Sequence, residues 1–151
     1  MQWSINTTCN NLHFENYPEL LFLFYAVPSK LMVNWENDVP FYHSGKEGVY
    51  ILASELLQIP AAVSLVNLKP YWIKENKEDA IWFDPESDSS WNIGAMKDVG
   101  TSTYNITSTD KTSMPFEVIN WEYQKGRNWI PTTDIKVQGK IFQMNLNQSK
   151  L

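Results

Sequence analysis

The sequence has few of the residues on which most enzyme active sites depend. Its 151 residues contain one cysteine, Cys9, which excludes an intramolecular disulfide and a cysteine-rich metal site. The two histidines are His13 and His43, and no serine-nucleophile motif accompanies them. Cys9 and His13 lie in no recognisable motif, so packing or surface roles are favoured over a catalytic pair. The six glycines fit no phosphate-binding loop, and the sequence predicts a protein that is not an enzyme.

Positive charge and long apolar runs are also scarce. The formal net charge is −5 and Arg127 is the only arginine, so we expect no basic patch that binds a nucleic acid. The longest apolar run, residues 20–27, is far shorter than the roughly 20 residues of a membrane-spanning helix. No lysine or arginine precedes it, as a secretory signal requires. The sequence predicts no membrane span and no signal peptide, and it leaves the compartment open.

Aromatic side chains, by contrast, are abundant. They make up 14% of the chain and include seven tryptophans, whereas disordered chains are poor in them. The length fits a single domain whose core is large enough to fold without disulfides.

Short β signals separated by turn residues follow one another from about residue 46 onward. Ile119, Trp121 and Tyr123 alternate with polar residues, which predicts a strand over 118–124 with one face in the core. We expect an all-β fold, an antiparallel sheet or β-sandwich of six to seven short strands with an irregular N-terminal extension. The other strands are expected over residues 49–53, 71–74, 80–83, 91–96, 104–107 and 134–138, the second and third of them as a hairpin.

The chain is expected to divide into three parts. Residues 1–45 carry three prolines and form an N-terminal extension that is irregular or contains a short helix or strand. Residues 46–144 form a tryptophan-rich β domain, in which Gly139 marks a turn or bulge. Residues 145–151 form a frayed tail.

Four sequence words occur in a fixed order: KPYW at 69–72, AIWFD at 80–84, WNIG at 91–94 and WEY at 121–123. In order and spacing, residues 48–138 resemble a small tryptophan-rich β module found, often in tandem, in multidomain animal and protist proteins, many of them extracellular. The resemblance implies a recognition or spacer module and an extracellular location, and it implies no activity. Leu68 follows Asn67 where the module has a glycine, which weakens the turn expected there.

Asp84, Glu86 and Asp88 alternate along a polar turn and form the one candidate metal site. Calcium is bound by several oxygen ligands at such a spacing, which makes calcium the one cofactor to consider. An EF-hand is excluded, because Ser89 and Ala95 stand where its glycine and glutamate belong. A solvated acidic turn is the favoured interpretation.

The tryptophans have two possible roles, core packing and ligand contact. An indole buries a large area in a core, and its apolar face also suits interface hot spots and the C–H face of a sugar ring. Core packing is the commoner role, but Trp72 and Trp129 border polar turns and are the better surface candidates. The candidate ligand-binding residues are Trp72, Trp129, Tyr71, Trp91, Arg127 and Asn128.

The sequence favours a non-catalytic recognition module that binds a protein or a glycan through aromatic and polar loop residues. A spacer domain without its own ligand shares these features, but it predicts that the tryptophans of residues 72–129 are all buried. A glycoside hydrolase is the third alternative, because paired carboxylates cleave glycosides. Its carboxylates would come from Asp84, Glu86, Glu117 and Glu122. All three alternatives leave the oligomeric state open.

Overall fold

The structure, a computed structural model, describes residues 27–37, 41–86 and 88–140. The Cys9–His13 pair, the tail expected over 145–151 and most of the apolar run at 20–27 lie outside these residues. No helix in the described part of the chain is long and apolar enough to cross a membrane.

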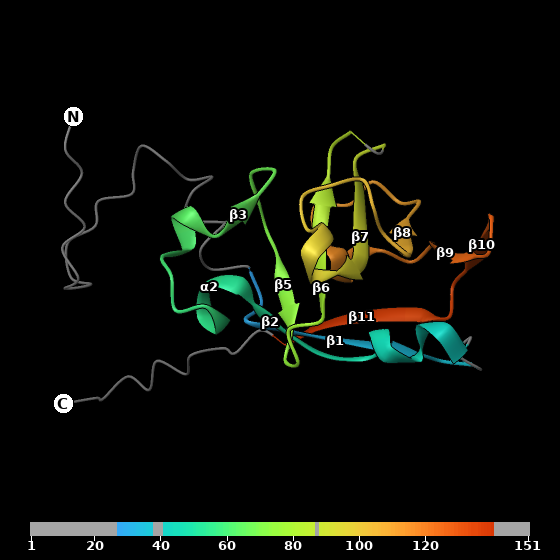
Figure 1. The fold of residues 1–151 in the computed structure, drawn as a ribbon, viewed down its shortest axis with the longest axis horizontal. Coiled ribbons are helices and arrows are strands. Elements are labelled where there is room, and N and C mark those ends of the chain that lie inside the picture. Colours follow the sequence, from blue (N-terminus) through green and yellow to red (C-terminus); the bar gives the residue numbers. More distant parts are fainter. Residues whose placement is uncertain (1–26, 38–40, 87, 141–151) are drawn as a thin grey trace, which may run out of the picture.

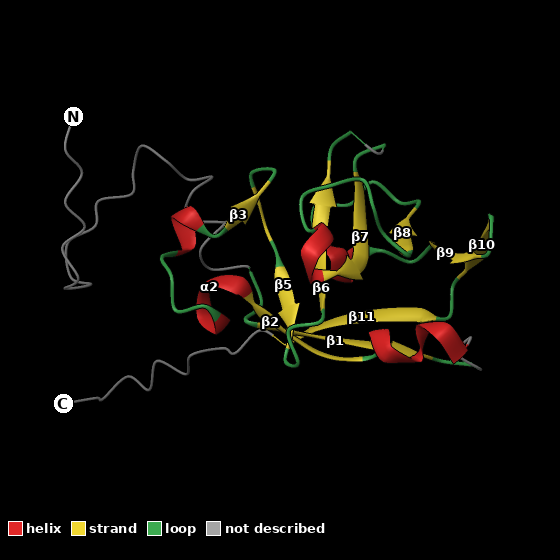
Figure 2. Cartoon of the chain, in the orientation of Figure 1, coloured by secondary structure: helices red, strands yellow, loops and turns green. Residues whose placement is uncertain are grey.

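Strands dominate the described part of the chain (Figure 2), and the all-β prediction is confirmed. One antiparallel sheet contains nine of the described strands. In sheet order they are β10 (Asn128–Thr132), β9 (Trp121–Lys125), β8 (Ile106–Ser108), β7 (Ser90–Ala95), β6 (Asp79–Asp84), β5 (Trp72–Lys74), β2 (Gly48–Leu52), β1 (Lys30–Trp35) and β11 (Ile135–Lys140). The expected hairpin of residues 71–83 is present as β5 and β6.

The remaining elements are short. A separate hairpin pairs β3 (Leu65–Val66) with β4 (Lys69–Pro70). The helical elements are α2 (Ala53–Leu56) and the short 3-10 helices η1 (Phe41–Lys46), η2 (Ala61–Val63), η3 (Met96–Asp98) and η4 (Pro115–Glu117).

The sheet nearly closes into a barrel, because two consecutive strands lie at opposite ends of the strand order. After β10 the chain passes through Thr133 and Asp134 and crosses to β1, with which β11 pairs along its whole length. Figure 1 shows β1 and β11 side by side, with the connection from β10 arriving at the end of β11. The Glu36 N–H donates to the Asp134 carbonyl oxygen at 2.9 Å, which attaches this connection to the end of β1.

The sheet has more strands than the six to seven predicted, for two reasons. β1 lies within residues 1–45, where the sequence predicts an extension, and it pairs with β2 and β11. β10 contains Pro131, which lacks an N–H and argues against a central strand. In the sheet β10 is an end strand with β9 as its one neighbour, and such a position tolerates proline.

Two hydrophobic clusters lie on opposite faces of the sheet. The first fills the inside of the sheet and contains Trp72, Trp91 and Trp121, all of them fully buried. The second covers the other face of β5 and β6, where Trp82 packs with Leu56 of α2 and with other apolar side chains. The second cluster includes no residue of β8, β9 or β10. The outer face of these three strands is therefore not covered by the second cluster.

Two details of the predicted pattern are wrong. Ile119 is 63% exposed and precedes β9, because Asp110 accepts hydrogen bonds from the Ile119 and Asn120 N–H groups and holds them outside the strand. Gly139 marks no turn but lies within β11. A Cβ at this position would lie 3.0 Å from Pro28 Cγ, so glycine permits a close approach of two segments.

The two-residue loop between β3 and β4 forms despite the leucine in it. Asn67 and Leu68 have φ angles of 51° and 63°, and the Asn67 amide donates to the Phe83 carbonyl oxygen at 2.8 Å. Leu68 therefore holds a left-handed conformation that favours glycine, while its side chain is 87% exposed.

We expect Leu68→Gly to raise the free energy of unfolding by about 0.5–1 kcal/mol in a urea titration, because it removes the backbone strain. A lower free energy of unfolding would contradict this and would show that contacts of the leucine side chain outweigh the strain.

Candidate functional site

The six candidate ligand-binding residues divide into a buried half and an exposed half. Trp72 and Trp91 are fully buried, and Tyr71 is 9% exposed. The Trp72 indole N–H donates to the Pro28 carbonyl oxygen at 2.8 Å, so the prediction that Trp72 lies at the surface is wrong. The reason is strand register, because β5 directs Trp72 to the inside of the sheet and the polar loop begins only after Lys74.

Trp129, Arg127 and Asn128 are exposed at the β9–β10 hairpin. Trp129 is 39% exposed, and its ring lies 5.7 Å from the ring of Tyr104 at an interplanar angle of 50°. The prediction that Trp129 reaches the surface is confirmed. Tyr104, which supports the Trp129 ring, was not among the predicted residues.

A groove of about 400 Å³ begins at these two rings, and we call it the aromatic groove. It is lined by Trp129, Tyr104, Asp88, Ser90, Thr107, Ser108, Thr109, Lys111 and Glu122. Apart from the two rings, every lining residue carries a hydroxyl, a carboxylate or an ammonium group. The groove therefore combines an aromatic surface with many hydrogen-bonding groups.

Strand register explains why these side chains meet. Directly opposed residues on neighbouring antiparallel strands project from the same face. Asn92, Thr107, Glu122 and Pro131 oppose one another in turn across β7, β8, β9 and β10. Trp129 lies two residues before Pro131 and so shares this outer face. The alternate residues of these strands, such as Ile106 and Trp121, point toward the core. Polar side chains are therefore left on the outer face.

A second groove of about 510 Å³, the polar groove, adjoins the first. Thr109 and Glu122 line both grooves and mark their junction. The polar groove is otherwise lined by Asn120, Trp121, Pro131, Thr132, Thr133 and Asp134. It thus reaches the connection between β10 and β11, where the sheet is not fully closed. We call the two grooves together the outer-face groove.

Asp110 positions one edge of the polar groove. Its carboxylate accepts hydrogen bonds of 2.8 Å from the Ile119 N–H, the Asn120 N–H and the Asn120 side-chain amide. These bonds, the one from the Asn120 side chain first, hold the pKa of Asp110 below its usual value. Asn120 is thereby held in one orientation although it is exposed.

Several polar groups of the outer-face groove are not used by the fold. The side chains of Thr107, Lys111 and Glu122 form no hydrogen bond or ion pair with the residues that the structure describes. Ser90 Oγ donates to Asn92 Oδ1 at 3.1 Å, so its lone pairs remain available as acceptors. Asn92 is fully buried beside the groove, and its Nδ2 has no hydrogen-bond partner among the described residues. The side chains of Thr107, Lys111 and Glu122 are therefore available to a ligand.

The three residues considered for calcium, Asp84, Glu86 and Asp88, are not grouped around one point. Asp84 is 3% exposed, and its carboxylate accepts hydrogen bonds from the Glu86 N–H at 2.9 Å and the Ser102 hydroxyl at 2.8 Å. Glu86 and Asp88 are exposed. In residues 27–37, 41–86 and 88–140, no three His, Cys, Asp or Glu side chains are grouped as a metal ion would require. Asp84 instead shapes the turn that follows β6.

The carboxylates of the hydrolase alternative have different structural settings. Asp84 is occupied as just described, and Glu117 accepts a hydrogen bond of 3.0 Å from the Met114 N–H beside η4. Of the four candidates, Glu122 alone lines the outer-face groove. The groove therefore contains one carboxylate of the predicted set, together with those of Asp88 and Asp134.

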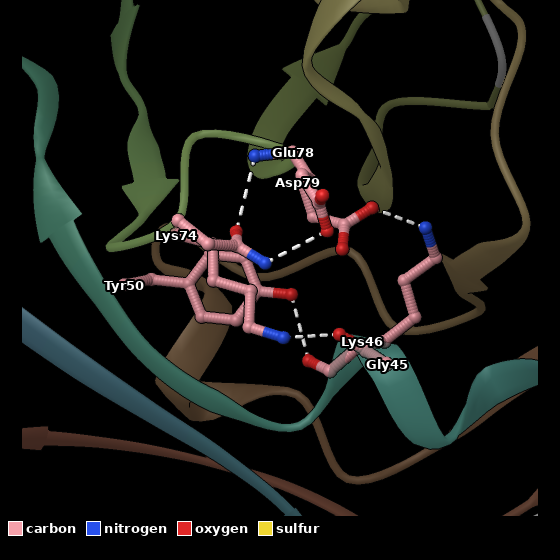
Figure 3. Close-up of polar contacts among 7 residues, drawn as sticks. Gly45, Lys46, Tyr50, Lys74, Glu78 and Asp79 are labelled. Atoms are coloured by element: carbon pink, nitrogen blue, oxygen red, sulfur yellow. Dashed lines mark hydrogen bonds and ion pairs between the residues drawn. The ribbon is translucent and has the colours of Figure 1, made fainter.

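A buried polar network joins η1 to the β5–β6 hairpin (Figure 3), and sequence reasoning missed it. Lys46 forms an ion pair with Asp79, and their side chains are 15% and 8% exposed. The Tyr50 hydroxyl donates to the Lys46 carbonyl oxygen at 2.7 Å, and the Lys74 ammonium donates to the Gly45 carbonyl oxygen. Lys46 and Asp79 are 33 positions apart, so no local pattern could have indicated the pair. None of these residues lines a groove described above, and we assign the network a structural role.

The buried Tyr50 predicts a loss of stability in alkali. Burial, and then the charge of Asp79, raise the pKa of Tyr50 well above its ordinary value of 10.0. Below about pH 10 the phenol is protonated in the folded and the unfolded chain and adds no pH dependence. Above it the unfolded chain loses this proton and the folded chain keeps it, so the free energy of unfolding falls by up to about 1.4 kcal/mol per pH unit.

We expect Tyr50→Phe to lower the free energy of unfolding by about 1 kcal/mol near neutral pH, because the bond to Lys46 is lost. The same variant is expected to flatten the decline above about pH 10 in urea titrations. An equally steep decline in the variant would contradict the assignment of this pH dependence to Tyr50.

Comparison of the chain with protein-family models, with curated proteins and with solved structures found no match. The candidate site is therefore defined by the geometry of the outer-face groove, with Trp129 and Tyr104 at one end and Glu122 at its junction.

Proposed function

We propose that this protein is a non-catalytic recognition module whose ligand lies in the outer-face groove. The observation that carries the proposal is the Trp129 ring, which is 39% exposed and lies against Tyr104 beside a groove of polar side chains. Aromatic anchors next to a few hydrogen-bonding groups are typical of ligand sites.

The exposure of Trp129 favours recognition over a spacer role. A spacer predicts that the tryptophans of residues 72–129 are all buried. Trp72, Trp82, Trp91 and Trp121 are fully buried, but Trp129 is not. An exposed indole forgoes hydrophobic stabilisation, which is reasonable where a ligand covers it.

The rigidity of the groove also supports binding. Thr107, Glu122 and Trp129 lie on β8, β9 and β10, which are paired to one another in register. Strand pairing fixes the backbone that carries these side chains, so a ligand has to order only the side chains themselves. Of the carboxylates predicted for a hydrolase, only Glu122 lines the groove, although Asp88 and Asp134 line it too. The Glu122→Gln variant described below tests that alternative.

The proposal is tested by screening the protein on a glycan array and against a displayed peptide library. We expect a selective, saturable ligand whose binding is lost in Trp129→Ala and retained in Leu68→Ala, an exposed apolar position outside the outer-face groove. Thermal unfolding of both variants confirms that they fold. Binding that Trp129→Ala leaves unchanged would contradict the site. Hydrolysis of a bound glycan that Glu122→Gln abolishes would contradict the non-catalytic assignment.

A further inference from the structure

The two parts of the outer-face groove adjoin at Thr109 and Glu122, which line both of them. We infer that a long ligand can occupy both parts, and we call them together the track. The track begins at Trp129 and Tyr104 and ends at the β10–β11 connection. A track with two parts in sequence suits an extended chain better than a single compact molecule.

The charges along the track disfavour an anionic ligand. Three carboxylates line it, Asp88, Glu122 and Asp134, against a single ammonium, that of Lys111. A phosphate backbone or a sulfated sugar would be repelled by the excess of negative charge. The Lys111 ammonium offsets only part of this negative charge.

The lining of the track favours a ligand that offers many hydrogen-bonding groups. Aromatic anchors such as Trp129 serve protein and sugar ligands alike, so the choice of ligand depends on the side chains beside them. Apart from Pro131 and the aromatic rings, every residue that lines the described track is polar. The hydroxyl groups come from Ser90, Thr107, Thr109, Thr132 and Thr133.

Resting on the proposed function, we propose that the outer-face groove binds an uncharged, linear oligosaccharide. One sugar ring lies against Trp129, whose apolar indole face matches the C–H face of a pyranose. The following rings extend past Glu122 toward Asn120 and Thr133. Carboxylates accept strong hydrogen bonds from sugar hydroxyls, and the Asn120 amide, held by Asp110, offers groups of both kinds.

The track makes chain length the decisive variable. A single sugar reaches the aromatic groove alone, whereas a longer oligomer also fills the polar groove. Affinity should therefore rise with the number of sugar units until both parts are filled. Glu122 lies at the junction, so its loss should weaken long oligomers and spare single sugars.

The test is calorimetric titration of the whole chain with β-1,4-linked oligomers of glucose, mannose, xylose and N-acetylglucosamine, each one to six units long. For at least one series we expect the dissociation constant to fall at least about tenfold between one and four units. Trp129→Ala should weaken every length by at least about tenfold, and Trp129→Phe should recover part of the loss. Glu122→Ala should weaken oligomers of four or more units and leave single sugars within about twofold.

Failure of all four series to bind, or an affinity that does not depend on length, would overturn the oligosaccharide inference. The inference would also be overturned if no oligosaccharide bound but a lysine-rich peptide or a protein bound through Trp129. That result would still support the proposed recognition function. Absence of any ligand that depends on Trp129 would overturn both.

Discussion

Asp79→Ala is expected to lower the free energy of unfolding by about 3–5 kcal/mol in urea titrations followed by tryptophan fluorescence. The substitution leaves the Lys46 ammonium without its partner in a site where that side chain is 15% exposed. An unpaired charge that is shielded from water lowers the free energy of unfolding far more than the intact pair does. The loss should also loosen η1, which the ion pair attaches to β6.

Two controls separate this effect from loss of a surface charge. Lys136 and Glu36 form a pair at 3.6 Å with side chains 33% and 58% exposed, so Glu36→Ala should cost less than about 1 kcal/mol. The double variant Lys46→Met/Asp79→Leu removes both charges and should recover most of the loss. Equal costs for Asp79→Ala and Glu36→Ala would contradict the buried role of the network.

Trp72→Ala is expected to lower the free energy of unfolding by about 3–5 kcal/mol, whereas Trp129→Ala should cost about 1 kcal/mol or less. Trp72 is fully buried, its ring lies 6.1 Å from that of Trp91, and its indole N–H is bonded to the Pro28 carbonyl oxygen. Trp129 keeps 39% of its surface exposed and contacts mainly Tyr104. The same substitution therefore tests two environments.

Chemical denaturation with circular dichroism checks this pair without relying on the fluorescence of the residues removed. Trp72→Phe is a useful intermediate, because it keeps a ring in the core and loses the bond to Pro28. A cost for Trp129→Ala as large as that for Trp72→Ala would contradict the assignment of Trp129 to the surface, and with it the recognition site.

The local alternation of apolar and polar residues predicted many of the strands. The hairpin of β5 and β6 was expected because apolar runs flank a charged loop, and β11 because Ile135 and Val137 alternate with polar residues. Local signals failed where a distant contact decides the outcome. Ile119 continues the alternation of β9, yet hydrogen bonds to Asp110 remove it from the strand. The sequence of β1 shows no strand pattern that distinguishes it from the proline-rich residues around it. It is a strand because it pairs with β2 and β11.

The site was predictable only in part, for a related reason. Trp129 could be found, because it follows a polar turn in a hairpin. Trp72 borders a polar turn as well, but register directs it to the core. Thr107 and Glu122 meet because β8 pairs with β9, and Tyr104 supports Trp129 from a segment 25 positions earlier. No pattern within one strand encodes such neighbours.

The most direct test of the outer-face groove is a nuclear magnetic resonance titration of ¹⁵N-labelled protein with the ligand selected on the glycan array. We expect the Trp129 indole signal and the backbone amides of Thr107, Glu122 and Asn120 to shift together with one saturation curve. The indole signals of the buried Trp72 and Trp91 should stay in place. Shifts confined to the apolar side of the molecule around Leu65 and Leu68, with the Trp129 signal unchanged, would contradict the assignment of the groove as the recognition site.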